Sequence, residues 1–533
     1  MKTFTTAIDY VNAAPHLGHA YEKIATDVLA RFWRLKGEPV FFLTGTDEHG
    51  TKVEKSSAAR NITPKVFTDE ISTQFRAAWQ SLDIAYDRFI RTTDPEHATV
   101  VKEIWRRMHA KGDLYKASYE GLYCPGCETF LNERDLDPQA DEPQCKLHPK
   151  TAIDRVAEEN WFFKLSAYKQ RLLDYFEAHP DFVLPAFRRA EALKMLEELV
   201  DISVSRSTRA VTWGIQVPDD ENQVIYVWID ALSNYLTGTG FMQDDAQFSQ
   251  QWPATSHIIG KDILRFHAIY WPAMLMSADL PLPGNVFAHG FITVNAEKIS
   301  KSSGNTLAPQ DLMDRFALPN ADAVRYYLMA STPFGQDGNF AEEEFKLKIN
   351  ADLANNLGNL LNRTVSMLGK YFGGQVPQVA VEPLGSADWV TRAGDAYARM
   401  AFHEACEIIL GQVDAANKLI NDAEPWTLYK GLQAGDEASA ARLQAVMTTV
   451  ATTLAQAAIA LSPVTPRLSQ GIWQQLGLSR HWPFSAAATW PKLENACDKG
   501  SNWFMQQSVT VDPQGPLLPR LDSELLGAAG KKN

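Results

Sequence analysis

The sequence predicts an α/β fold, a doubly wound parallel sheet that is split by an insertion and followed by an all-α helix bundle. Short apolar runs alternate with helix-periodic segments over residues 1–115 and again over 224–290, which is typical of strands joined by crossover helices. The alternation breaks over residues 116–223, and from Asp322 onward the periodicity is almost wholly helical. A ligand is expected at the switch point between the two halves of the sheet.

Individual elements follow from periodicity and from residues that end or begin helices. The first helix extends to Leu35 and stops at Gly37, and another is predicted over residues 264–276. The predicted strands cover residues 4–10, 40–44, 257–259 and 286–288, and the second half of the sheet region opens at 224–230. The helical runs of the bundle cover residues 342–371, 385–420, 437–461 and 465–476.

Two cap-and-proline pairs predict further helix starts. Thr63-Pro64 and Asp94-Pro95 each place a capping side chain directly before a proline at the first helical position. Both pairs lie in the first half of the sheet region.

Length and charge limit the possible functions. A chain of 533 residues suggests three or four domains, at a prior of roughly 150 residues each. The net charge of −13 argues against a protein that coats nucleic acid through bulk charge, although a local basic groove is compatible with it. No apolar run approaches the ~18 residues of a membrane span, and the start of the chain lacks the apolar core of a signal peptide. We therefore expect a cytoplasmic protein with no membrane partner.

A CxxC and a CxxH pair in the insertion have the spacing of a metal knuckle. Cys124, Cys127, Cys145 and His148 would hold one tetrahedral Zn²⁺ per chain through three thiolates and one imidazole. With four protein ligands and no open position, this zinc is expected to be structural. The alternative is a coincidence in a surface loop, which would leave Cys124 and Cys127 as exposed free thiols.

Two histidines and two lysines, far apart in the sequence, form a candidate phosphate site. His16 and His19 begin the first helix, whose unpaired N–H groups and positive dipole end favour phosphate. Lys298 and Lys301 lie in a loop of small and polar residues that could close over a polyphosphate. Taken alone, the histidine pair is better explained as two ordinary surface residues, and the lysine pair is what favours a phosphate site. Neither a Walker A pattern nor G-x-G-x-x-G is present, so a phosphate site must rest on these four side chains.

These motifs, His16-Leu17-Gly18-His19 and Lys298-Ile299-Ser300-Lys301-Ser302, resemble the HIGH and KMSKS signatures of class I aminoacyl-tRNA synthetases. From residue 3 to about residue 475 the chain is similar to the methionyl-tRNA synthetases. The resemblance implies a Rossmann-type catalytic domain and ATP-dependent activation of L-methionine to methionyl-adenylate. The methionyl group would then pass to the 3′ end of tRNA(Met), initiator and elongator.

The resemblance also assigns residues to the amino-acid site. Asp47 would hold the substrate ammonium, and aromatic walls suit an unbranched thioether because sulfur packs well against rings. Asp9 departs from the tyrosine or proline usual in the family, which leaves the shape of that wall open. The residues matched to the methionine pocket are Ala7, Ile8, Tyr10, Asp47, Trp228, Ala231, Leu232, Tyr235, Ile263 and His267. Core packing is the competing explanation for the aromatic members.

ATP and tRNA contacts follow in the same way. The residues matched to ATP binding, with Mg²⁺, are His16, His19, Gly260, Asp262, Lys298 and Lys301, and the two histidines and two lysines would be catalytic. The residues matched to anticodon reading are Asn359, Arg363 and Trp426. A solvated helix face is the default explanation for an isolated Asn and Arg, whereas an accessible Trp fits the stacking by which single-stranded bases are read.

The expected domain organisation has six parts. They are a first Rossmann half over 1–115, a connective insertion over 116–223 with its zinc knuckle at about 118–160, a second half over 224–290, a KMSKS-type loop and stem-contact region over 291–341, a helical anticodon-binding domain over 342–495, and a C-terminal extension over 496–533 that packs back on the body. The lack of an appended dimerising domain favours a monomer.

Two other functions stay open at this stage. A ligase for another small amino acid, cysteine, would keep the fold, but its zinc would need a vacancy for the substrate thiolate. A non-catalytic, zinc-containing tRNA-binding protein would not need both histidines and both lysines.

Overall fold

The computed structural model describes most of the chain. It covers residues 1–126, 129–131, 135–138, 140, 142–146, 148–149, 151–294, 297–298, 307–380, 384–386, 388–487, 489–499 and 507–521.

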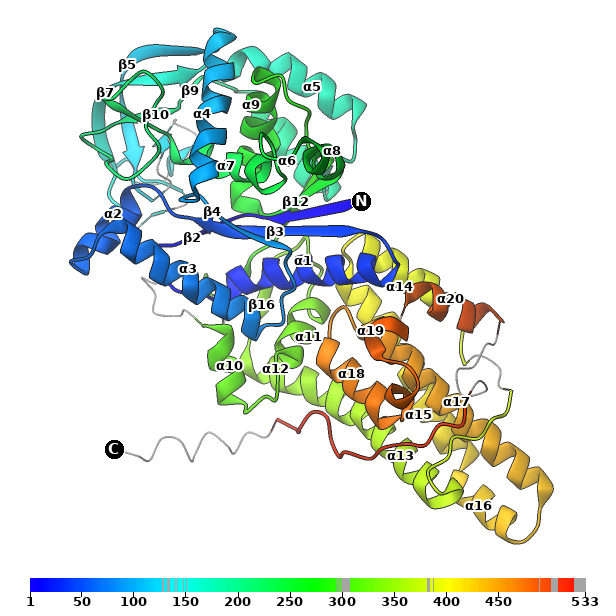
Figure 1. The fold of residues 1–533 in the computed structure, drawn as a ribbon. Helices are drawn as coiled ribbons and strands as arrows, with labels where there is room; N and C mark the ends of the chain where they lie inside the picture. Colours follow the sequence, from blue (N-terminus) through cyan, green and yellow to red (C-terminus); the bar gives the residue numbers. More distant parts are fainter. Residues whose placement is uncertain are drawn as a thin grey trace, which may run out of the picture.

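A parallel sheet of seven described strands forms the centre of the α/β part (Figure 1). Its order is β2-β3-β1-β12-β13-β8, and β4 also pairs with β3. The strands are β1 (Lys2–Thr6), β2 (Asp9–Tyr10), β3 (Val40–Asp47), β4 (Arg88–Arg91), β8 (Val183–Leu184), β12 (Thr255–Gly260) and β13 (Asn285–His289). Because β1 lies between β3 and β12, the two halves of the chain meet along β1. The predicted switch point is confirmed.

Helices cover both faces of this sheet, each over its own apolar core. On one face pack α1 (Leu17–Leu35) and α3 (Pro64–Ser81), which share a core with the helical bundle. On the other face pack α4 (Pro95–Ala110), α7 (Val227–Gly238) and α9 (Trp271–Ser277). Figure 1 shows α4, α7 and α9 above the sheet and α1 and α3 below it. The doubly wound α/β class is thereby confirmed.

The two predicted helix caps have different outcomes. Thr63 caps α3 as expected, since its hydroxyl accepts from the backbone N–H of Val66 at 3.3 Å. Asp94 precedes α4 but makes no cap bond to it. Its carboxylate instead accepts from the backbone N–H of Arg91 at 2.9 Å, which ties the loop after β4. The prediction for Asp94 was right about the helix start and wrong about the cap.

The second half of the sheet region differs from its prediction in two places. Residues 224–230 add no strand to the main sheet: β11 (Gln223–Ile225) pairs antiparallel with β10 (Ser205–Ser207), and α7 begins directly after it. The predicted helix over 264–276 is a π-helix (Phe266–Tyr270) followed by α9. Pro272 has no backbone N–H for the regular ladder, which accounts for the change in helical pitch before it.

The insertion builds a sheet of its own and also contributes to the main one. Its strands are β5 (Leu114–Cys124), β6 (Thr129–Leu131), β7 (Asp154–Phe163) and β9 (Ile202–Ser203), in the order β6-β5-β7-β9. Its helices are α5 (Lys169–Ala178) and α6 (Ala186–Leu196). Between them β8 joins the edge of the main sheet beside β13, a pairing that the sequence analysis missed because β8 has only two residues.

The connection to the bundle is a small sheet with order β15-β14-β16. It consists of β14 (Ile292–Val294), β15 (Glu297–Lys298) and β16 (Gly338–Phe340), with α10 (Pro309–Arg315) and α11 (Asp322–Ala330) between them. Short helices at other points of the chain are α2 (Thr51–Ala59), α8 (Asp245–Gln251), α19 (Phe484–Ala487) and α20 (Trp490–Lys499).

The bundle follows its predicted runs, except that the run over 385–420 is two helices and that the helix Pro425–Gln433 was not predicted. Its helices are α12 (Glu342–Lys348), a π-helix (Ile349–Gly358), α13 (Asn359–Phe372), α14 (Trp389–Ala398), α15 (Phe402–Ala423), α16 (Pro425–Gln433), α17 (Glu437–Leu461) and α18 (Pro466–Gln475). Gly373 ends α13 in the left-handed region, with φ of 59°. Of the helices described, α17 has the length and hydropathy to cross a membrane, but 83% of its most apolar 18-residue window is buried as the core of the bundle.

A buried arginine holds the bundle to the α/β part. Arg325 of α11 pairs with Asp27 of α1 at 2.6 Å, and both side chains are fully buried. The guanidinium also donates to the carbonyls of Leu82 at 3.0 Å and Val464 at 2.9 Å. Residues 515–521 lie along the bundle, where the backbone N–H of Leu521 donates to Asn350 at 2.7 Å.

Candidate active site

A cavity of 590 Å³ opens at the carboxyl ends of β1, β3 and β12, beside the switch point. All ten residues matched to an amino-acid pocket line it: Ala7, Ile8, Tyr10, Asp47, Trp228, Ala231, Leu232, Tyr235, Ile263 and His267. They come from segments far apart in the sequence, and the fold brings them together. Asp262 also lines the cavity, whereas Gly260, His16 and His19 are not among its lining residues.

The hydrogen bonds of His267 fix its protonation. Its Nδ1 lies 3.1 Å from the carbonyl oxygen of Ile263 and donates to it, so Nε2 is the acceptor for the hydroxyl of Tyr235 at 2.7 Å. Burial lowers the pKa of His267 to about 4. The cavity therefore presents a neutral imidazole and a neutral phenol, an environment for an uncharged polarisable side chain.

Trp228 forms another wall with a residue that the sequence analysis missed. Its ring stacks on that of Phe266 with centroids 3.7 Å apart and planes 7° apart. His267 meets the same indole edge-on at 6.3 Å. Phe266 directly precedes His267 in the π-helix, and that position was the signal that could have identified it.

Two buried aspartates near the cavity differ in whether they line it. Asp47, at the end of β3 and 7% exposed, lines the cavity. Asp9 does not: it is 5% exposed and pairs with Lys23 of α1 at 2.7 Å. The unusual residue at position 9 is thus tied to the helix beneath the wall.

His16 and His19 cap the helix that they begin. The Nδ1 of His16 accepts from the backbone N–H of Gly18 at 3.2 Å, and the Nδ1 of His19 accepts from the backbone N–H of His16 at 3.2 Å. Both rings therefore carry their proton on Nε2. They stack with centroids 3.8 Å apart, and burial, with the charges of His16 and Lys23, holds the pKa of His19 well below its usual value. Two neutral N–H donors thus stand at the positive end of α1.

The lack of a side chain at Gly260 leaves room for the carboxylate of Asp262. A Cβ at Gly260 would lie 2.7 Å from a carboxylate oxygen of Asp262, so a larger residue would displace that side chain. Gly260 is also the register partner of His289 on β13. Of the lysine pair, Lys298 has its backbone in β15, opposite Thr293. Its side chain, and the whole of Lys301, lie outside the described residues.

Three of the four predicted metal ligands converge. The ligand atoms of Cys124, Cys145 and His148 lie within 4.8 Å of one another, and both cysteines are buried. A Cβ at Gly126 would lie 2.4 Å from the ring of His148, so glycine is needed for this approach. Cys127 lies outside the described residues. Two sulfurs and an imidazole in a closed cluster fit a zinc ion.

The knuckle also forms a wall of the cavity, which its sequence did not predict. Cys145, Lys146 and His148 line the cavity opposite the β-strand ends. Two contacts hold the knuckle there. The ammonium of Lys52 on α2 donates to the carbonyl of Gly126 at 2.7 Å. Arg265 pairs with Asp135 at 3.3 Å.

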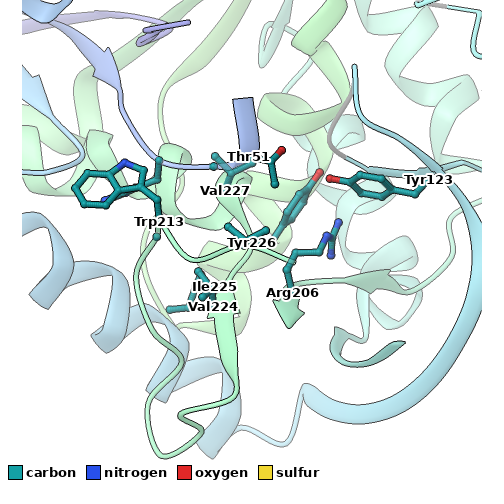
Figure 2. Close-up of a pocket in the computed structure, with 12 residues that line it drawn as sticks. Thr51, Tyr123, Arg206, Trp213, Val224, Ile225, Tyr226 and Val227 are labelled. Atoms are coloured by element: carbon teal, nitrogen blue, oxygen red, sulfur yellow. The ribbon is translucent and has the colours of Figure 1, made fainter. Parts of the chain in front are cut away.

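A second, small hollow of 20 Å³ lies behind the cavity wall and has room for a water molecule. Figure 2 shows Arg206 beside the rings of Tyr226 and Tyr123, at one end of the hollow, and Trp213 at the other. The guanidinium lies 4.6 Å from the ring centroid of Tyr226 and 5.5 Å from that of Tyr123. Val227 borders both this hollow and the main cavity.

A buried His–Asp–His chain joins the elements around the cavity. The Nδ1 of His49, two residues after Asp47, lies 2.6 Å from Asp230 of α7. The Nε2 of His97 on α4 lies 2.8 Å from the other oxygen of Asp230. Burial alone would raise the pKa of Asp230, but the charges and hydrogen bonds of the two histidines outweigh it and lower that pKa to about 2.

The three residues matched to anticodon reading share one end of the bundle. Asn359 is exposed at the start of α13, and Trp426 is 43% exposed at the start of α16. Arg363 donates to Asn421 at 3.1 Å, five residues before Trp426, which holds α13 beside the turn from α15 to α16. Figure 1 places this end of the bundle far from the sheet.

Proteins of known function are similar to this chain in sequence and in structure. The family of class I tRNA synthetases (M) matches residues 2–365. The methionine–tRNA ligase of Thermosynechococcus vestitus is 45% identical, with 90% of each chain covered, and that of Synechocystis is 43% identical, with 97% of each covered. The chain belongs to the methionyl-tRNA synthetase family. A solved structure of Mycobacterium tuberculosis methionyl-tRNA synthetase in complex with methionyl-adenylate is 40% identical, with a TM-score of 0.87 over 98% of this chain and 100% of the other.

Membership in the methionyl-tRNA synthetase family confirms the resemblance seen in the sequence and makes the chain a ligase of the aminoacyl-tRNA synthetase class. The alternatives of a cysteine-specific ligase and of a non-catalytic tRNA-binding protein are not favoured.

We predict that Asp230 makes acid stability depend on pH. Its pKa rises from about 2 to 3.8 on unfolding, so its stabilisation is full above about pH 4 and is lost as the pH falls toward 2. By pH 3 the loss should reach about 1 kcal/mol. Urea unfolding followed by near-UV circular dichroism from pH 5 to pH 3 should show a shallower decline for Asp230→Asn. Exposed Asp174→Asn is the control, and equal declines in wild type and Asp230→Asn would contradict the prediction.

Proposed function

We propose that the 590 Å³ cavity is the methionine site of a methionyl-tRNA synthetase. The observation that carries this proposal is the convergence of all ten matched residues on one cavity. Asp47 would pair with the substrate ammonium. Trp228, Tyr10, Tyr235 and His267 would surround the thioether, whose sulfur packs favourably against rings. A neutral His267 places no cation beside that side chain.

Activation then requires positioning and charge stabilisation rather than a protein nucleophile. A carboxylate oxygen of methionine attacks the α-phosphorus of ATP, and the bond from phosphorus to the pyrophosphate oxygen breaks. The Nε2–H groups of His16 and His19 would donate to the phosphate oxygens. Gly260 and Asp262 would contact the adenosine. Lys298 and Lys301 would neutralise the charge that develops on pyrophosphate, and Mg²⁺ supplies further charge when bound with ATP.

The second step transfers the methionyl group to tRNA(Met), initiator or elongator. A hydroxyl at the 3′ end attacks the methionyl carbonyl and AMP leaves. Asn359, Arg363 and Trp426 would read the anticodon, with the indole stacking on a base. The exposure of Asn359 and Trp426 at the far end of the bundle supports this role. The bundle of residues 342–495 would then be the anticodon-binding domain.

The knuckle would hold one structural zinc ion. Cys124, Cys145 and His148 supply three ligands, and Cys127 would be the fourth. Four protein ligands leave no position for substrate, so the ion would fix the cavity wall formed by the knuckle. We further propose that the protein is a cytoplasmic monomer and that its domains follow the six ranges predicted from the sequence.

Exchange of pyrophosphate into ATP, assayed with each of the twenty amino acids, tests the methionine site. Wild type should respond to methionine alone. Asp47→Asn should raise KM for methionine by roughly tenfold or more, because a buried charge-assisted contact is lost. Asp174→Asn, on an exposed helix face, should match wild type. A methionine KM in Asp47→Asn equal to that of wild type would remove Asp47 from the site.

The zinc proposal is tested by metal content and by local stability. Cys124→Ser should lose zinc in elemental analysis and increase amide hydrogen exchange over residues 116–160, with any fall in activity following from that disorder. Cys406→Ala, which removes a buried thiol from the bundle, should keep its zinc. Wild type free of zinc, or Cys124→Ser that retains it, would refute the site.

Trp426 separates the two half-reactions. Trp426→Ala should leave methionine-dependent exchange near normal and reduce aminoacylation of tRNA by about tenfold, since stacking is worth ~1–3 kcal/mol per base. Phe187→Ala, which removes another exposed aromatic from the insertion, should change neither rate. Equal damage to exchange and aminoacylation would identify Trp426 as a structural residue and would overturn the anticodon assignment.

A further inference from the structure

Four charged side chains are buried together beneath the wall of the cavity. The ammonium of Lys23 lies 2.7 Å from Asp9 and 3.0 Å from Glu22. The other carboxylate oxygen of Glu22 lies 3.0 Å from the Nε2 of His289. All four residues are at most 6% exposed. We call this group the buried quartet.

The contacts of the quartet form a chain from His289 through Glu22 and Lys23 to Asp9. The Nδ1 of His289 lies 2.7 Å from the carbonyl oxygen of Gly290, which can only accept, so this nitrogen carries a proton. Its Nε2 faces the carboxylate of Glu22, which also accepts from Lys23. Lys23 thus contacts both carboxylates, and burial, opposed by Lys23, raises the pKa of Asp9 to about 7. Burial by itself lowers the pKa of Lys23, but Asp9 and Glu22 outweigh it and raise that pKa, so the ammonium stays charged.

The quartet connects three parts of the active site. Lys23 lies one turn after His19 on α1, the helix that begins with the histidine pair. Its ammonium also donates to the carbonyl of Ala7 at 2.9 Å. Ala7 and Ile8 line the cavity. His289 ends β13 beside Gly260, so the group extends from the cavity wall to the nucleotide side.

Stability alone does not explain this arrangement. Apolar residues of similar volume commonly stabilise a core as well as a buried ion pair does, because the pair must be desolvated. The neighbours of Lys23 on α1, Ala20, Ile24 and Leu29, are packed in that apolar way. An apolar residue at position 23 could not donate a hydrogen bond to the carbonyl of Ala7, as Lys23 does.

We propose that Lys23 is a positioning residue for the amino-acid site: paired with Asp9, it fixes the Ala7–Ile8 wall of the cavity against the helix that carries His16 and His19. The inference rests on the proposed assignment of the cavity to methionine. Lys23 touches no substrate, and its effect passes through the backbone of the wall.

The decisive variant removes the pair without leaving a buried charge. In Asp9→Val/Lys23→Met the contact between Glu22 and His289 is left in place, and valine suits the strand position of residue 9. Lys23→Gln with Asp9 intact is the conservative variant, because its amide can still donate to the Ala7 carbonyl. Lys346→Met is the matched control, since Lys346 is another buried lysine, 5% exposed, paired with Glu343 in the bundle.

Methionine KM, ATP KM and kcat from pyrophosphate exchange, together with the thermal unfolding midpoint, form the readout. The double variant should raise methionine KM about tenfold, leave ATP KM within about twofold and unfold within a few degrees of wild type. Lys23→Gln should stay within about threefold of the wild-type methionine KM, and Lys346→Met should match wild type.

Three results would overturn the inference. They are a methionine KM in the double variant within twofold of wild type, a parallel rise in the KM for both substrates, or equal methionine KM values for Lys23→Gln and the double variant. Asp47→Asn separates this failure from failure of the proposed function. If Asp47→Asn raises methionine KM and the double variant does not, only the role of Lys23 is refuted. If neither does, the cavity is not the methionine site.

Discussion

The buried ion pair between Arg325 and Asp27 sets the position of helix α1, on which the rest of the molecule depends. Arg325 also donates to carbonyls beside α3 and at the end of α17, so one guanidinium joins the catalytic sheet region to the bundle. Replacing one partner of such a pair lowers the stability of the protein, because the charge of the other partner stays buried without compensation. Helix α1 is therefore fixed between the main sheet and the bundle. The same contacts fix the position of His16 and His19 at its first turn.

The fold could be predicted where local signals and tertiary packing agree. The helix ending at Leu35, the helix over 437–461 and the break at the insertion all follow from periodicity and from glycine or cap residues. The misses have physical causes. Residues 229–238 of α7 are all buried, and a helix buried along its length has no hydrophobic period that would distinguish it from a strand. The two-residue strand β8 is held by pairing with β13, where Val183 lies opposite Val286, 103 residues further along the chain. No local sequence pattern encodes such a contact.

The site was predictable in composition and less so in geometry. Ten residues were matched to the amino-acid pocket, and the structure gathers all ten around one cavity. Asn234 and Lys261, from the same segments, also line the cavity and were not predicted. Phe266, Lys52 and the pair of Arg265 with Asp135 were not predicted, because their importance comes only from what lies opposite them. Tautomers of His16, His19 and His267 likewise depend on backbone partners that a sequence does not reveal.

The order of strands in the main sheet has a consequence for synthesis of the protein. β1 is made first, but its partner β12 begins at Thr255, so one edge of β1 lacks its neighbour until roughly half the chain has left the ribosome. An uncovered strand edge is a template for pairing with other chains. The insertion, whose antiparallel sheet is local in sequence, can fold during that interval. The catalytic centre therefore forms late in folding, because β12 must be made and must pair with β1 before the sheet is complete.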